Sequence, residues 1–257
     1  MAKLNKLSKM VAAARKNSIA DEFMHDLEYC IEQENKREYT PSTSFKPSGI
    51  SGCKRSLYYE LIGIKPDVEP PSVELTGICE SGTDRHEMLQ NYVMLMKQYG
   101  IKCKWLDVEK YVRENKIPGL KVLSKNGNET KLFSETYNMR FLCDGLIEYK
   151  GELYILEIKT ESANKFNNHT EPWPDHIQQA TCYSMVLQVP KVIFVYENRD
   201  ICSKKAYLVN VTPQMISRVE GIIDSVNAYV LAEEVPPREE TKCKYCKYCT
   251  QCKKDGE

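Results

Sequence analysis

The sequence has no excess charge of either sign, because its 36 basic and 36 acidic side chains cancel. This balance excludes a global positive field as a basis for binding nucleic acid, so any such binding has to come from local patches. No apolar run approaches the roughly 20 residues that a bilayer-spanning helix needs, and the first residues contain no signal-peptide hydrophobic block. We therefore expect a soluble protein of the cytoplasm.

The sequence also lacks internal repeats and a Gly-x4-Gly-Lys-Ser/Thr loop, which argues against an ATPase activity of its own. Cysteine, in contrast, is abundant: of the 11 cysteines, four lie close together as Cys243, Cys246, Cys249 and Cys252. An odd total without a secretion signal argues against a disulfide framework and indicates metal ligation in a reducing compartment.

The 257 residues, of which 42% are hydrophobic, suit one large domain with a substantial core, or such a domain with an appendage. The apolar pattern predicts a mixed α/β fold in which helices come first, followed by a meander of strands, a crossover helix and further strands. We expect an N-terminal helical extension over residues 1–46, a core over 47–236 and a cysteine-rich tail over 237–257.

Caps, turns and periodicity give the boundaries of the expected elements. The expected helices are two within Leu4–Glu34 that break near Asn17–Ser18, one capped by Ser51 that stops near Gly63, Thr83–Gln98, Asp175–Gln188 and Pro213–Glu233. The expected strands are Val108–Arg113, Leu120–Ser124, one through Leu132–Phe133 after an Asn126-Gly127 turn, Arg140–Tyr149, Glu152–Thr160, Lys191–Glu197 and Ala206–Val211.

The strongest chemical signal is Asp144 followed by Glu157-Ile158-Lys159. If Lys150-Gly151 is a two-residue hairpin turn, Asp144 lies directly opposite Glu157, and side-chain alternation puts Lys159 on the face of Glu157. Facing carboxylates repel each other. The arrangement therefore predicts a bound Mg²⁺ or Mn²⁺, with the two carboxylates, the Ile158 carbonyl and waters as its oxygen ligands.

An exposed acid–lysine pair is the competing interpretation of the same hairpin. The neighbouring residues are apolar, however, and a charge buried among them costs several kcal/mol unless it is paired or bound to a metal. His86, on the expected Thr83–Gln98 helix, is a further candidate ligand or a structural histidine. Gln179 and Tyr183 lie four residues apart on a later helix and share one face, which is either an ordinary polar edge or a contact to phosphate or metal-bound water.

The cysteine tail contains Cys243-x2-Cys246-x5-Cys252, which supplies three thiolates where a tetrahedral site needs four. The fourth ligand is either Cys249 within the tail or the distant Cys53. A zinc knuckle built from the four tail cysteines is the simple alternative, and iron–sulfur clusters also use four thiolates, so the spacing leaves the metal open.

The polar candidates follow one another in a characteristic order, namely His86, Asp144, Glu157-x-Lys159 and Gln179-x3-Tyr183. This order resembles the RecB-like branch of the PD-(D/E)xK nuclease superfamily. A cysteine before that region and Cys-x2-Cys-x5-Cys after it are similar to the iron–sulfur subgroup, which includes the CRISPR-associated exonuclease of the Cas-four type, AddB-type nuclease domains and phage-encoded relatives. The likeness covers residues 48–253 and implies a restriction-endonuclease-like core, a mixed central sheet flanked by helices.

The resemblance implies a metal-dependent DNA nuclease, and by analogy an exonuclease on single strands. The implied ligands of Mg²⁺ or Mn²⁺ are His86, Asp144, Glu157 and the Ile158 carbonyl. Lys159 would orient the attacking water and stabilise charge, while Gln179 and Tyr183 would support the site and contact DNA. A non-catalytic, metal-stapled nucleic-acid-binding or adaptor protein is the main rival, and an iron–sulfur electron carrier is a weaker one.

The resemblance further implies a 4Fe–4S cluster, or Zn²⁺ as the alternative, held by Cys53, Cys243, Cys246 and Cys252. The extra thiol of Cys249, and the Lys54-Arg55 pair after Cys53, depart from the family pattern and leave the ligand choice open. Basic residues that could contact DNA phosphates, although each by itself is more often a solvated or packing residue, are Lys54, Arg55, Arg85 and Lys165. Candidate partners are a helicase and a CRISPR- or recombination-type protein. The sequence leaves the oligomeric state open.

Overall fold

The structure, a computed structural model, describes residues 18–36, 38–67, 71–239, 243 and 246–256. The chain divides into two compact units: Met1–Tyr39 with Val68–Ser81, and Thr40–Asp67 with Gly82–Glu257. The boundaries at residues 46 and 236 that the sequence predicts stay a prediction. Among the described residues, no helix combines the length and the apolar character that crossing a membrane requires.

The smaller unit contains α2 (Ile19–Glu34), which begins where the sequence predicts a break. Ser18 caps this helix, because its side chain accepts a hydrogen bond from the backbone N–H of Asp21 at 3.1 Å. None of the residues of α2 is buried. The helix that we expect before Asn17 lies outside the described residues.

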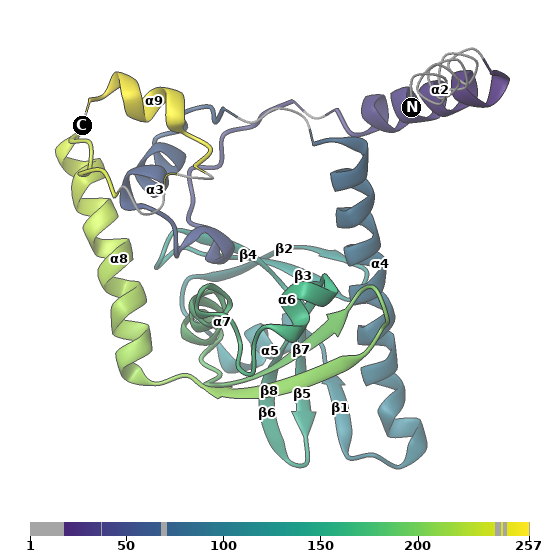
Figure 1. Cartoon of the computed structure of the whole chain (residues 1–257). Coiled ribbons are helices and arrows are strands. Elements are labelled where there is room, and N and C mark those ends of the chain that lie inside the picture. The colour runs from purple at the N-terminus through teal and green to yellow at the C-terminus, as the bar shows by residue number, and fades with distance from the viewer. Residues whose placement is uncertain (1–17, 37, 68–70, 240–242, 244–245, 257) are drawn as a thin grey trace. The chain divides into compact units, whose positions relative to one another are not determined.

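The larger unit begins with α3 (Lys54–Leu61) and the Gly82–Leu95 part of α4 (Val73–Leu95). The remaining helices are α5 (Val108–Asn115), α6 (Ala163–Asn167), α7 (Pro174–Leu187), α8 (Pro213–Ala232) and α9 (Cys249–Lys254), with short 3-10 turns at Pro47–Gly49 and Met96–Tyr99. The strands, labelled in Figure 1, are β1 (Cys103–Leu106), β2 (Leu120–Asn126), β3 (Glu129–Ser134), β4 (Met139–Cys143), β5 (Gly145–Tyr149), β6 (Glu152–Glu161), β7 (Lys191–Asn198) and β8 (Lys204–Asn210).

The strands form a five-stranded sheet with the order β1-β5-β6-β7-β8 and a three-stranded sheet with the order β2-β3-β4. The five-stranded sheet is mixed, because β6 and β7 are parallel and its other neighbours are antiparallel. The crossover between β6 and β7 carries α6 and α7, as parallel neighbours require. The predicted fold class, a mixed central sheet flanked by helices, is confirmed.

Helices cover both faces of the five-stranded sheet. On one face Ile155 of β6 belongs to the main core with residues of α7 and α8, such as Val186 and Val226. On the other face Leu89 of α4 packs against Leu156 and Ile158. The alternation of Ile155, Leu156 and Ile158 between the two faces is the period-two pattern of a strand buried on both sides.

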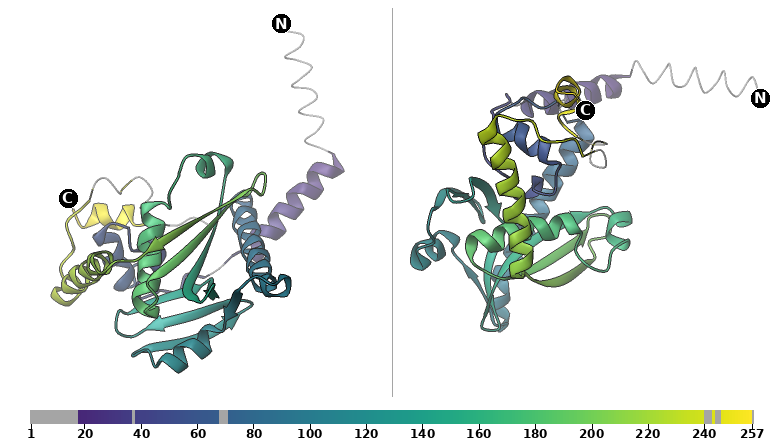
Figure 2. Two further views of the ribbon diagram at one scale, coloured as in Figure 1. Left: turned by 90° about the horizontal axis from the view of Figure 1, so that it is seen from below. Right: turned by 90° about the vertical axis from the view of Figure 1, so that its left-hand side faces the viewer.

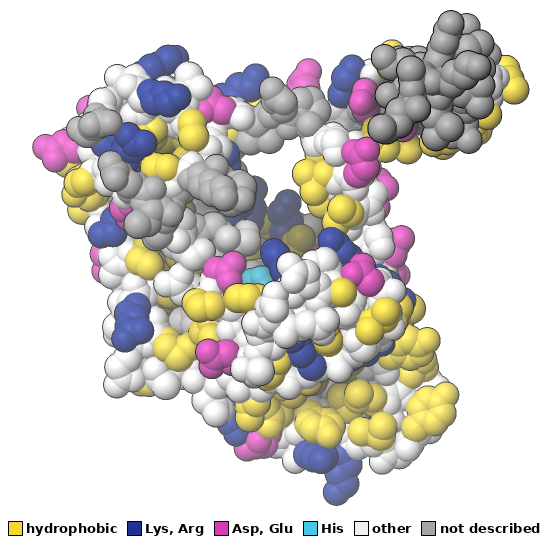
Figure 3. Space-filling model, in the orientation of Figure 1, with side chains coloured by type: hydrophobic (Ala, Val, Ile, Leu, Met, Phe, Trp, Pro, Cys, Tyr) yellow, Lys and Arg dark blue, Asp and Glu magenta, His cyan; other side chains and the backbone are white. Residues whose placement is uncertain are grey.

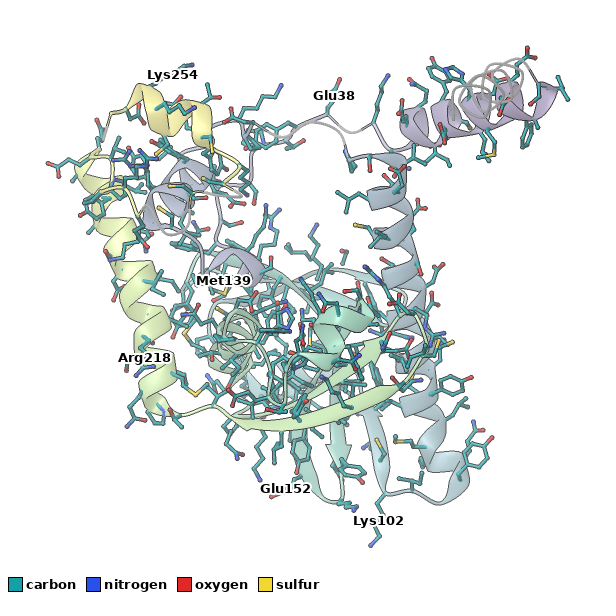
Figure 4. All side chains as sticks on the ribbon, viewed as in Figure 1. Glu38, Lys102, Met139, Glu152, Arg218 and Lys254 are labelled. Carbon is teal, nitrogen blue, oxygen red and sulfur yellow. The ribbon has the colours of Figure 1, made fainter. Side chains whose placement is uncertain are left out.

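The residues labelled in Figure 4 differ in burial. Met139 of β4 is fully buried beside Phe45, to which its backbone forms a β-bridge. Lys102 and Glu152, at the bottom of that view, are exposed. On the face that Figure 3 displays, the described Lys and Arg side chains are interspersed with Asp and Glu rather than gathered into one patch.

The cysteine tail lies beside α3 and α8, as both views in Figure 2 show. Tyr59 of α3 packs against Tyr248 with ring centroids 5.5 Å apart, and its hydroxyl donates to Asp255 at 2.6 Å. Lys247 forms an ion pair with Glu60 at 3.0 Å. Tyr59 and Tyr248 are almost fully buried, so the tail shares the core of the larger unit.

Several predicted elements are confirmed with boundaries that differ by a few residues. These are the hairpin of β2 and β3 after Asn126, the hairpin of β5 and β6, and α7, β7, β8 and α8. The Lys150-Gly151 turn has φ values of 54° and 87°, both in the left-handed region that this two-residue turn requires. The resulting register, from Tyr149↔Glu152 to Gly145↔Leu156, is the one predicted.

The strand expected over Val108–Arg113 is wrong, because this segment is the helix α5. Asp107 caps it by accepting a hydrogen bond from the N–H of Lys110 at 2.8 Å. Val108 and Val112, four residues apart, are both buried on one helical face. In this short segment, the helix cap at Asp107 outweighs the preference of valine for β-strands.

The prediction of a single strand over Arg140–Tyr149 is also wrong. The strand β4 ends at Cys143, and after Asp144 the chain continues as β5 in the other sheet. Gly145 leaves room for Trp105, because a Cβ at this position would lie 2.4 Å from the indole ring. No larger residue could follow Asp144 along this path without moving that indole ring.

Smaller corrections concern the other helix starts. The helix expected from Thr83 begins at Val73 and ends at Leu95, before a 3-10 turn and Gly100 at φ 75°. Ser51 does not cap α3, which follows Cys53 directly. The elements that the sequence did not indicate are β1, α6 and α9, and each is no longer than six residues.

Candidate metal centre

Asp144 lies where two antiparallel ladders end. In the five-stranded sheet the last pair of β5 and β6 is Gly145↔Leu156, so the next residue of β6 is Glu157. In the three-stranded sheet the last pair of β3 and β4 is Thr130↔Cys143, so the next residue towards the turn is Glu129. The break at Asp144 thus brings one carboxylate from each sheet towards the same residue.

Beyond Leu156, no strand among the described residues pairs with one edge of β6, and Asp144 occupies part of that edge. Its Oδ2 accepts a hydrogen bond from the backbone N–H of Ile158 at 2.9 Å. The N–H and C=O of one residue in an extended strand point to the same side. The Ile158 carbonyl therefore faces the edge where Asp144 lies, which is the direction required for the predicted ligand.

Glu157 is 2% exposed, and its Oε1 lies 2.7 Å from Nζ of Lys159. Among the described residues, no donor reaches its other oxygen, Oε2. Burial, followed by repulsion from Asp144, raises the pKa of Glu157 to about 7. Burial also raises the pKa of Asp144 to about 6, although the Ile158 N–H and the Lys159 ammonium oppose it.

His86 and Glu129 complete a group with Asp144 in which the three potential ligand atoms lie within 4.8 Å of one another. Nδ1 of His86 is 3.7 Å from Oδ2 of Asp144. Burial lowers the pKa of His86, so its imidazole is neutral near neutral pH, the form that binds metals. Burial and then repulsion from Glu157 raise the pKa of Glu129.

Sequence reasoning missed Glu129. Its signal was the Asn126-Gly127 turn, because the residue that starts the next strand is Glu129. Placing it near Asp144 would also have required the register of β3 and β4, whose connecting turn, residues 135–138, carries no Gly or Pro signal.

Lys159 connects the acidic group to α7. Its Nζ donates to Oε1 of Gln179 at 3.0 Å, and Nε2 of Gln179 donates to the hydroxyl of Tyr183 at 2.6 Å. Burial raises the pKa of Tyr183 well above its usual value, so the phenol keeps its proton. Lys159, Gln179 and Tyr183 thus form one hydrogen-bonded row, while their roles stay predictions.

The four basic residues suggested for DNA contact have different surroundings. Arg55 is 4% exposed, and its guanidinium donates to the carbonyls of Pro236 and Gly256 at 2.6 and 2.8 Å. Arg85 pairs with the buried Glu197. Both guanidiniums are therefore engaged within the protein. Lys165 on α6 is exposed, and Lys54 is half-buried.

Cys53 and the tail lie close together. Cys53 and Cys246 line one cavity of about 300 Å³ beside α3. Sγ of Cys252 accepts a hydrogen bond from Nη1 of Arg55 at 3.3 Å. The thiol of Cys249 donates to the carbonyl of Cys246 at 3.1 Å. Since none of these cysteines is in a disulfide, their thiols are available as ligands.

Neither a family model nor a curated protein matches the sequence. The solved structures that match include the protein SSO0001, with 15% identity and a TM-score of 0.46 over 91% of this chain and 97% of that chain. An alkaline exonuclease from Laribacter hongkongensis has 13% identity and a TM-score of 0.46 over 75% of this chain and 90% of that chain. Its complex with dAMP has 15% identity and a TM-score of 0.45 at the same coverage. These identities and TM-scores are too low to indicate a function, so we infer the function from the geometry of the site.

Proposed function

We propose that this protein is a divalent-metal-dependent nuclease that hydrolyses phosphodiester bonds in DNA. The observation that carries the proposal is the group of His86, Glu129 and Asp144, whose potential ligand atoms lie within 4.8 Å of one another. The buried Glu157 is repelled by Asp144, and the ammonium of Lys159 lies beside Glu157. Buried and partly buried carboxylates in such a group repel one another. A divalent cation would remove that repulsion.

The donor set fits Mg²⁺ or Mn²⁺. Oε2 of Glu157 is buried and has no donor among the described residues, which leaves it free to act as a metal ligand. Carboxylate and carbonyl oxygens suit both ions, and a neutral imidazole suits Mn²⁺ better than Mg²⁺. The residues that would hold the ion are Asp144, Glu157, His86 and the Ile158 carbonyl, joined by Glu129.

A phosphodiester resists hydrolysis because its negative charge repels the attacking nucleophile. A bound divalent cation supplies a Lewis acid for the phosphoryl oxygen and makes an attacking water more acidic. Lys159 would place its ammonium where negative charge develops on the phosphate, and Glu157 together with Gln179 would hold that ammonium in place. Tyr183, which stays protonated, would fix the amide of Gln179 in the orientation that accepts from Lys159.

Within this class we favour an exonuclease on single-stranded DNA, because the order of the polar residues resembles exonucleases of the RecB-like branch. Exposed Lys165 follows β6, the strand of Glu157 and Lys159, and Lys54 lies on α3. These two lysines are the basic residues of the predicted set that remain for phosphate contacts. The net charge of the protein is zero, and few lysines remain to contact DNA phosphates. We therefore expect the affinity for DNA to depend only weakly on salt concentration.

The cysteines would hold a 4Fe–4S cluster through Cys53, Cys243, Cys246 and Cys252, with Zn²⁺ as the alternative. The shared cavity of Cys53 and Cys246 supports a site that joins α3 to the tail. Such a site would stabilise the fold and take no part in cleavage. An absorption spectrum of anaerobically purified protein separates the two, because iron–sulfur protein is brown and zinc protein is colourless.

The decisive experiment is cleavage of end-labelled single-stranded DNA with Mn²⁺, with Mg²⁺ and with EDTA. We expect cleavage with either metal, none with EDTA, and none by Asp144→Asn at an unchanged melting temperature. A purified protein that binds DNA but cleaves it under none of these conditions would be the non-catalytic adaptor. Equal cleavage by Asp144→Asn would exclude this centre as the active site.

A further inference from the structure

The backbone carbonyl of Asp144 belongs to neither sheet. The ladder of β4 ends at Cys143 and that of β5 begins at Gly145, so the carbonyl between them has no strand partner. Nε2 of Gln90 donates to this carbonyl at 2.8 Å, and Gln90 is only 1% exposed. Gln90 therefore satisfies the peptide carbonyl at which the chain passes from β4 to β5.

Gln90 stands four residues after His86 on α4, so the two side chains share one face of the helix. His86 faces the carboxylate of Asp144, with Nδ1 3.7 Å from Oδ2. Gln90 holds the backbone of that same residue. One turn of α4 thus contacts Asp144 twice, through His86 and through Gln90. The hydrogen bond of Gln90 fixes the position of α4 along its axis relative to the carboxylate of Asp144.

Arg85, the residue before His86, makes a second polar contact that holds α4 in place. Nε of Arg85 donates to Oε1 of Glu197 on β7 at 2.5 Å. Glu197 is fully buried, and Nζ of Lys204 lies 3.0 Å from its Oε2. The apolar contacts of α4 with this face of the sheet come from Leu89, with Val93 packed against the same cluster. Apolar packing is non-directional, so the polar contacts are what set the rotation and register of the helix.

We propose that Gln90 is a positioning residue of the metal centre, and that Arg85 with Glu197 is its second support. The two contacts hold His86 at the distance from Asp144 at which both can bind one cation. This inference rests on the proposed function, since it concerns the same ion. Outer-shell partners of metal ligands typically contribute about 10- to 100-fold to metal affinity.

The test is calorimetric titration of Mn²⁺ into the full chain after removal of bound divalent ions, without DNA. The variant Gln90→Met keeps the length of the side chain and removes the donor. We expect its Mn²⁺ dissociation constant to rise about 10- to 100-fold, with a melting temperature in EDTA within a few degrees of wild type. Glu87→Gln, an exposed change on the same helix, is the matched control and keeps wild-type affinity.

A variant of the second support provides an independent check if Gln90→Met does not fold. Glu197→Gln keeps the shape of the side chain but removes the charge that Arg85 contacts, and we expect a weaker Mn²⁺ affinity. Arg85→Lys, which keeps the positive charge, should retain more affinity than Arg85→Met. Wild-type affinity in Gln90→Met, or in Glu197→Gln where Gln90→Met is unfolded, would overturn the inference. Wild-type protein that binds no Mn²⁺ would instead contradict the proposed function.

Discussion

Asp144 caps the open edge of β6, because its Oδ2 accepts the backbone N–H of Ile158 at 2.9 Å. This hydrogen bond stands where a strand would otherwise pair, since β5 begins only at the next residue, Gly145. The Ile158 carbonyl points to the same side of the strand as its N–H and so faces Asp144. The proposed metal centre therefore depends on the interruption between β4 and β5, because a continuous strand paired with β6 would cover this edge.

Glu157→Gln should stabilise the metal-free protein at alkaline pH. The pKa of Glu157 is raised from 4.5 to about 7 and that of Asp144 from 3.8 to about 6. A carboxyl whose folded-state pKa is raised takes up protons on folding, so stability falls as the pH rises from about 4 to about 7. In thermal melts with EDTA, the melting temperature of the variant should exceed that of wild type at pH 8. The difference in melting temperature should disappear towards pH 4.

Metal ions should reverse that order. Mn²⁺ at pH 8 stabilises wild type by binding the ionised carboxylates, and the stabilisation grows with concentration. Glu157→Gln should gain little from Mn²⁺. Glu148→Gln, at an exposed position of β5, is the control and should follow wild type with and without the metal. A metal-free Glu157→Gln that melts below wild type at pH 8 would contradict the account.

Lys159→Met should lower kcat by about 10²- to 10³-fold, the usual effect of losing one pre-positioned charge at a reacting group. Its Nζ lies 2.7 Å from Oε1 of Glu157 and 3.0 Å from Oε1 of Gln179, so two contacts hold the ammonium in place. Single-turnover cleavage with saturating Mn²⁺ measures the effect.

Lys165→Met provides the contrast. Lys165 is exposed on α6, and its loss should raise KM and lower the salt dependence of DNA affinity while kcat stays near wild type. If Lys159→Met raised KM alone, Lys159 would be a DNA contact and not part of the reacting site.

The sequence could predict the parts of the site that depend on local rules. The turn at Lys150-Gly151 sets the register that puts Asp144 next after the pair Gly145↔Leu156, and helical spacing joins Gln179 to Tyr183. These follow from periods of two and of 3.6 residues. They required no knowledge of distant contacts, which is why they could be derived.

The parts that were missed depend on contacts between distant segments. Glu129 approaches Asp144 only because β4 and β5 belong to different sheets, and Gln90 approaches it only because α4 packs on Leu156 and Ile158. For Arg55 the sequence left a phosphate contact and a packing role open, and the guanidinium donates to the carbonyls of Pro236 and Gly256, far away in the chain. No local pattern encodes these arrangements.

Glu129→Gln should weaken Mn²⁺ binding and cleavage by about tenfold or more, because the carboxylate lies within reach of both His86 and Asp144. The substitution keeps the shape of the side chain and removes one charge from a crowded group, so the metal-free protein should not be destabilised. Glu135→Gln, an exposed glutamate beyond the end of the same strand, is the control. Unchanged Mn²⁺ affinity and activity in Glu129→Gln would show that Glu129 takes no part.

The tail provides a last prediction, concerning which thiols bind metal. Cys53→Ser should lose bound iron or zinc and lower the melting temperature, because Cys53 shares a cavity with Cys246 and joins two distant parts of the chain. Cys249→Ser should keep the metal, since the proposed ligands are Cys53, Cys243, Cys246 and Cys252. Elemental analysis of purified variants measures metal per chain. Full metal content in Cys53→Ser with loss in Cys249→Ser would instead indicate a site formed by the four tail cysteines.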